Sequence, residues 1–157
     1  MKLFIAIATL CLATVPAVSH AAEADHHHHE EGPKKLALDE GGKKWATDAA
    51  LRKGMEQLKT LVEADHPPIH AKKFTTEEYR ALSKKLEEPI GEIFRTCKLP
   101  PKADAMLHVV LLDVLDAMKV MGGDAPVTEK RSAFVRIVTS LNGYGEHFDH
   151  PGWTRVR

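Results

Sequence analysis

Three residues whose side chains can bind soft metal ions lie far apart in the sequence, at Met55, Cys97 and His108. A thioether, a thiolate and an imidazole together suit Cu(I), and the thiolate and imidazole without the thioether suit Zn(II). A histidine run close to the start of the chain is a second candidate, because short His-rich tracts bind divalent metals; it comprises His26, His27, His28 and His29. A purification tag or a solvated tail is the alternative interpretation of that run.

The compartment that the N-terminal sequence predicts makes Cys97 a residue that needs an explanation. Lys2 precedes an apolar run over residues 3–18, and small residues before Ala21 predict a signal peptide over residues 1–21. A membrane anchor would need about 20 apolar residues, and Pro16 interrupts the run too early. Cleavage removes Cys11, so we expect a periplasmic protein with Cys97 as its one thiol. Such a thiol is a buried apolar residue, a ligand, or half of a disulfide that links a homodimer.

Composition limits the partners and the number of domains. After loss of Lys2 the chain has 21 basic and 22 acidic side chains, a balance that indicates no nucleic acid and no acidic membrane surface. We expect no membrane insertion of the mature chain. Its length suits one domain. We predict a flexible His-rich segment over 22–44, a domain over 45–153 and a C-terminal tail over 154–157.

Apolar spacing predicts helices and no strands. A first helix is expected from Thr47 or Asp48 until the prolines at 67 and 68 stop it. A second begins with the capping-box pattern at residues 75–78 and reaches Cys97 on its buried face, with a kink or a break at Pro89. A third begins near Pro101 and lasts to about Met121, and a fourth is capped by Thr128 and runs toward Phe148.

These lengths and short connections predict an all-α protein, an up-down-up-down four-helix bundle. In that topology Met55, Cys97, His108 and residues 144–150 meet at one end. His66 and His70 lie at the opposite end. The fold therefore turns three separate residues into a predicted metal site, with copper favoured over zinc and the histidine run as an auxiliary collector.

A purely structural role is the alternative for each of these residues. Methionine at helical spacing usually fills core gaps, and a histidine in an apolar helix usually has a hydrogen-bonded neighbour. Residues 149–153 are expected to form a structural clasp, with Trp153 and Trp45 covering the bundle end. We expect no enzyme, because a helix C-terminus raises the pKa of a thiol and so opposes a nucleophilic role for Cys97. A structural or interaction bundle without a ligand is the principal alternative function.

The early Met55 and the late His147 resemble the axial ligands of the cytochrome b562 and cytochrome c-prime class of periplasmic haem bundles. That resemblance implies haem b held without covalent attachment by Met55 and His147, in an electron-transfer bundle. No Cys-x-x-Cys-His motif is present, so the covalent c-type pattern does not apply. The chain is also similar to small uncharacterised exported proteins of Gram-negative bacteria, through Gly42 to Arg52, Cys97 to Pro101 and Phe148 to Trp153. This second resemblance implies the fold and the location but no activity.

Overall fold

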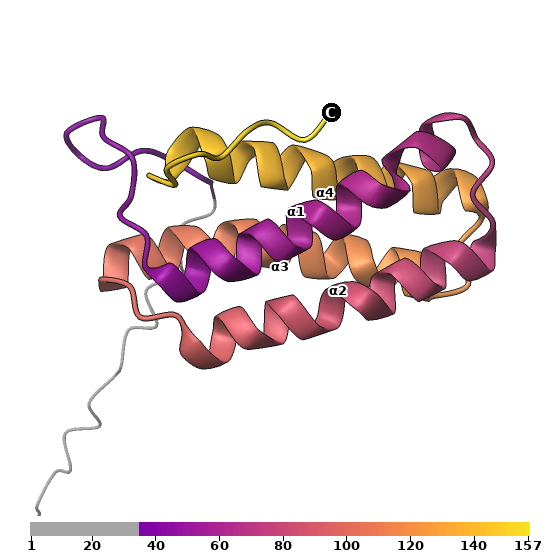
Figure 1. The fold of residues 1–157 in the computed structure, drawn as a ribbon, viewed down its shortest axis with the longest axis horizontal. Coiled ribbons are helices and arrows are strands. Elements are labelled where there is room, and N and C mark those ends of the chain that lie inside the picture. Colours follow the sequence, from indigo (N-terminus) through magenta and orange to yellow (C-terminus); the bar gives the residue numbers. More distant parts are fainter. Residues whose placement is uncertain (1–34) are drawn as a thin grey trace, which may run out of the picture. The chain divides into compact units, whose positions relative to one another are not determined.

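The computed structural model describes residues 35–157. The predicted signal peptide and His26 to His29 lie outside the described residues. Within 35–157 the chain forms four helices and no strand, apart from one isolated bridge between Trp45 and Phe148. The helices are α1 (Ala49–His70), α2 (Thr76–Thr96), α3 (Pro101–Gly122) and α4 (Val127–His147). The predicted all-α four-helix bundle is confirmed (Figure 1).

The helices pack in chain order, with the closest association between α3 and α4, followed by α1 with α2 and α2 with α3. Apolar side chains from all four helices form one buried core, as the stripes predicted. Its largest fully buried apolar members are Tyr79, Tyr144, Phe134, Phe148, Leu51, Met55, Leu58, Leu82, Leu86, Ile93 and Leu107. Among the described residues, no helix combines the length and the apolar character that crossing a membrane requires.

The C-terminal segment runs back along α4 (Figure 1). It bonds to both α1 and α4, two helices that make little contact with each other. Val156 is buried, and its backbone exchanges two hydrogen bonds with the side chain of Asn142 on α4. Thr154 accepts a 2.6 Å hydrogen bond from Lys59 on α1. Residues 154–157, predicted as a tail, are therefore part of the packed structure.

Two helix starts follow their sequence signals. The Asp48 carboxylate accepts a hydrogen bond from the Leu51 amide and so caps α1. Thr75 and Glu78 form the predicted capping box at the start of α2. The start of α4 differs, because Pro126 rather than Thr128 is its N-cap and makes no side-chain cap. The Pro126 carbonyl accepts from the amides of residues 129 and 130, which begins the helix earlier than predicted.

The prolines break neither of the helices that contain them. The sequence pattern predicted an end of the first helix at Pro67 and Pro68, but α1 continues through both to His70. The amides of Ala71 and Lys73 bond to the two proline carbonyls, and buried Ile69 anchors this turn in the core. Pro89 likewise lies inside an uninterrupted α2, so of the predicted kink or break the break into two helices is wrong. A proline removes one donor, and the burial of Ile69 in α1 and of Pro89 in α2 holds both helices in the core despite that loss.

Candidate functional site

One end of the bundle brings together the start of α1, the end of α2, the start of α3 and the end of α4 (Figure 1). At this end Cys97 and His108 line the same pocket, with a volume of about 190 Å³. Asp104 also lines it, and the apolar wall comprises Ile93, Phe94, Leu107 and Leu111. The structure therefore joins two of the three predicted internal ligands and adds a carboxylate to them.

Cys97 lies directly after the last residue of α2. Its amide still bonds to the Ile93 carbonyl, but its own backbone is extended, with φ −64° and ψ 135°. The thiol consequently leaves the buried stripe of α2 and is only half-buried. Cys97 therefore packs against the core, as predicted, but it is not fully buried.

The surroundings of Cys97 keep it protonated. Burial raises the pKa of the thiol to about 11, and the Asp48 and Asp104 carboxylates add to the rise because they disfavour a second negative charge. The direction agrees with the expectation from a helix C-terminus, although the causes are burial and these two carboxylates. A thiol with this pKa is a poor nucleophile near neutral pH.

His108 stands one turn after Asp104 on α3. Its Nδ1 lies 2.9 Å from the Asp104 carbonyl oxygen and 3.4 Å from the Asp104 carboxylate. Because a carbonyl oxygen only accepts, Nδ1 carries the hydrogen and the Nε2 lone pair of the neutral ring is free. His108 is thus in the tautomer that binds a metal through Nε2, with its ring oriented by the backbone.

Met55 does not line the pocket of Cys97 and His108. Its side chain is 0% exposed and belongs to the hydrophobic core. The preceding residue, Gly54, faces Ile93, one turn of α2 below Cys97. The thioether is therefore part of the hydrophobic core, as in the gap-filling alternative given for it.

The pocket is not a preformed metal centre. Within residues 35–157, no group of three or more His, Cys, Asp or Glu side chains is arranged to hold a metal ion. Cys97, Asp104 and His108 line one small space, but they would have to rotate toward a common point to share an ion. The donor types fit Zn(II), which accepts thiolate, imidazole and carboxylate ligands.

The predicted clasp is present beside this end. Trp45 and residues 147–149 exchange two backbone hydrogen bonds of 2.8 Å, and Trp153 packs on the Tyr144 ring with 4.9 Å between centroids. The His150 side chain is 4% exposed, with Nδ1 2.9 Å from the Tyr144 hydroxyl and Nε2 3.5 Å from the Glu56 carboxylate. His150 therefore has protein partners on both ring nitrogens.

The haem alternative finds no favourable geometry in the described residues. His147 donates from Nδ1 to the Gly143 carbonyl at 2.8 Å, which leaves its Nε2 free. Met55, however, is enclosed in the core. Ligation of haem by both residues would require core side chains to separate.

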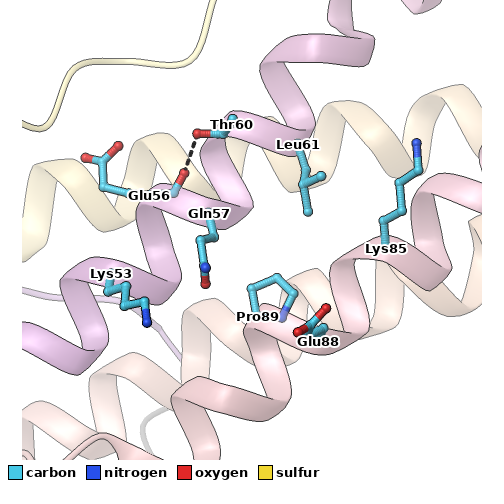
Figure 2. A pocket seen from close by; sticks show the side chains of 8 residues that line it. All are labelled: Lys53, Glu56, Gln57, Thr60, Leu61, Lys85, Glu88 and Pro89. Carbon is cyan, nitrogen blue, oxygen red and sulfur yellow. Dashed lines mark hydrogen bonds between the residues drawn. The ribbon is translucent and has the colours of Figure 1, made fainter.

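A larger groove of about 580 Å³ lies between α1 and α2 (Figure 2). It carries charged groups of both signs at its rim and an apolar floor that includes Leu61 and Pro89. No cysteine or histidine lines it, and the one hydrogen bond among its residues joins Thr60 to the Glu56 carbonyl. The groove therefore offers no thiol or imidazole as a soft ligand. Its lining comprises Lys53, Glu56, Gln57, Thr60, Leu61, Lys85, Glu88 and Pro89.

Comparison with known proteins adds no assignment, since no family model, no curated protein and no solved structure matches the chain. Asp48 and Asp104 are the site residues that sequence reasoning missed. The i,i+4 spacing of Asp104 and His108 on one helix was the available signal, because residues four apart share a helix face.

Proposed function

We propose that this protein is an exported, periplasmic metal-binding helical bundle, with Cys97, Asp104 and His108 as its internal ligands. The observation that supports this proposal is their presence in one pocket of about 190 Å³ at the end of the bundle. His26 to His29 would collect metal as an auxiliary tract. The location and the role of the tract rest on the N-terminal sequence alone.

The donor set favours zinc over copper as the ion. The copper preference depended on the thioether of Met55, which is buried in the core and does not line the pocket. A carboxylate takes its place, and a thiolate, an imidazole and a carboxylate together are typical Zn(II) ligands. Cu(I) would have to bind through Cys97 and His108 alone.

Electrostatics of the pocket support a cation. The Asp48 and Asp104 carboxylates that help raise the pKa of the Cys97 thiol disfavour a lone thiolate. The same charges attract a divalent ion, and a thiol that coordinates the metal releases its proton to the solvent. The pocket therefore suits a thiolate together with a metal better than a free thiolate.

Binding requires a small rearrangement. The imidazole of His108 keeps its hydrogen bond to the Asp104 carbonyl, while the thiol and the carboxylate turn toward Nε2. Both side chains are only partly buried, so the motion needs no opening of the core. One proton is released from the thiol as the metal binds.

Anaerobic titrations with Zn(II) and Cu(I) against a chelator test the proposal. They use a chain in which His26 to His29 are replaced by serine, so that the tract does not compete. We expect one ion at this pocket, with its affinity lowered by about tenfold or more, at least about 1.4 kcal/mol, in Cys97→Ser and in His108→Gln. His147→Gln is the matched control, because His147 makes the same bond to a carbonyl four residues earlier but lies outside the pocket.

Equal and weak binding by the parent chain and Cys97→Ser would reject the internal site. A structural or interaction bundle would then be the better description. A Soret band after addition of haem, abolished by His147→Gln, would instead support the haem alternative.

A further inference from the structure

The end of the bundle opposite to Cys97 carries a pair of histidines. His66 and His70 lie in the last turns of α1, and their rings stack with centroids 6.1 Å apart and planes 24° from parallel. They line a pocket of about 230 Å³, whose floor is formed by Ile69, Phe134 and Val135. His70 is exposed and His66 is half-buried against the Phe134 ring, so both are open to an ion from solvent.

Two histidines four residues apart on a helix face the same side, which is the spacing that lets two imidazoles share one metal ion. Imidazole binds Zn(II), Cu(II) and Ni(II) well. Metal-bound nitrogens lie about 2.0–2.1 Å from the ion, so chelation requires the two stacked rings to tilt toward a common point. His70 is exposed and can turn with little resistance, whereas His66 is half-buried against the Phe134 ring, so His70 makes the larger change of side-chain torsion.

The backbone between the two histidines is weakened. Pro67 and Pro68 lack amide hydrogens, so the carbonyls of Glu63 and Ala64 lose the donors that an uninterrupted helix would give them. The turn is retained by the hydrogen bonds from Ala71 and Lys73 to the proline carbonyls and by burial of Ile69. An ion held by both His66 and His70 would bridge this turn from outside.

Charges around the pocket act against a cation but do not block it. Lys72, in the left-handed region at φ 58°, and Arg131 of α4 also line the pocket. Lys72 is exposed and Arg131 is half-buried, so water screens much of the repulsion. Their presence favours an ion bound through neutral imidazoles over one held by charge attraction.

We propose that His66 and His70 form a second, two-histidine site for a divalent transition metal, and that the bound ion stabilises the proline-containing last turn of α1. This inference is independent of the proposed function, because the pair shares no residue with the pocket of Cys97. It adds a site to the protein whether or not that pocket binds metal.

Ni(II) is the probe, because imidazole is a good ligand for it. Calorimetry uses the full chain with Cys97→Ser and with His26 to His29 replaced by serine. Since two linked ligands gain by chelation, His66→Gln and His70→Gln should each lower affinity by about 100-fold, and the double variant should lose little more. His108→Gln, at the other end, is the control and should leave this affinity unchanged.

Amide hydrogen exchange directly tests whether the bound ion stabilises the last turn of α1. Ni(II) should slow exchange at Ala71 and Lys73, whose amides close the last turn, and should have no effect in His70→Gln. Equal Ni(II) affinity in the parent chain and both single variants would overturn the site. Binding that depends on both histidines but leaves exchange at Ala71 and Lys73 unchanged would overturn the proposed stabilisation of the last turn.

Discussion

Asp48 accepts a 2.6 Å hydrogen bond from the backbone amide of Lys98 through Oδ2, while its Oδ1 accepts one of 2.6 Å from Leu51. One carboxylate thus caps α1 and fixes the chain where it leaves α2. We expect Asp48→Ala to lower the free energy of unfolding by about 1–3 kcal/mol, because a cap and a second amide lose their acceptor. Urea denaturation measures the loss.

Asp48→Asn separates the two contacts. Its single amide oxygen replaces only one acceptor, so its stability should fall between those of the parent and Asp48→Ala. Glu87→Ala, at an exposed position of α2, is the control and should change stability by less than about 0.5 kcal/mol. A change of that small size in Asp48→Ala would show that water replaces both contacts.

The Cys97 thiol should react slowly with iodoacetamide in the folded protein. Its pKa is raised to about 11 by burial, with the Asp48 and Asp104 carboxylates adding to the rise, so only a small fraction is thiolate at neutral pH. The alkylation rate should rise about tenfold per pH unit from pH 7 to 10 without a plateau. Mass spectrometry follows the reaction.

Asp104→Asn removes one of the charges that raise this pKa, so the variant should react faster at each pH. The urea-unfolded chain should instead level off above about pH 8.5, the ordinary value for cysteine. A plateau near that pH in the folded protein would mean that neither burial nor the two carboxylates act on the thiol.

The sequence was sufficient to predict which residues lie toward each end of the bundle. It was not sufficient to predict how deeply each of them is buried there. Apolar stripes, the Asp48 cap and short connections were sufficient to bring Cys97 and His108 to one end. Met55 was placed with them because it is early in α1, but its level depends on how Gly54 packs against Ile93. That register is set by packing between helices, which a pattern within one helix does not contain.

The role of the last residues was also beyond the sequence pattern. Residues 154–157 contain a single apolar residue, Val156, which is too little for a periodicity. It is held by Asn142 of α4, and the nearby Thr154 is held by Lys59 of α1, which is 95 residues away in the sequence. A segment stabilised by such contacts resembles a solvated tail until the helices are assembled.

Gly54 is expected to be intolerant of a side chain. A Cβ at this position would lie 2.3 Å from Ile93 Cγ1, so Gly54→Ala should cost about 1–3 kcal/mol although alanine is the better helix former. In the Ile93→Ala background the clash is absent, and Gly54→Ala should then be neutral or stabilising. A double-mutant cycle from urea denaturation gives the coupling.

Gly91→Ala on α2 is the matched control for Gly54→Ala. A Cβ there meets only the flexible Arg95 guanidinium, at 3.2 Å, so this variant should gain up to about 1 kcal/mol. If Gly54→Ala stabilised the protein as much as Gly91→Ala, the close packing of α1 on α2 would be wrong.

His150 should make the fold sensitive to mild acid. Burial lowers the pKa of this histidine below 6.5, an effect that Glu56 partly offsets and that Arg52 and Lys59 reinforce, while the Tyr144 hydroxyl faces Nδ1. Because the unfolded chain binds the proton more readily, stability is complete above about pH 6.5 and is lost as pH falls toward the folded pKa.

Urea midpoints between pH 7.5 and 5.5 should therefore decrease in the parent protein and decrease less in His150→Gln. His70→Gln, at an exposed position, should retain the parent's slope. Equal slopes for the parent and His150→Gln would mean that the clasp accepts a charged imidazole, with Glu56 compensating for the burial.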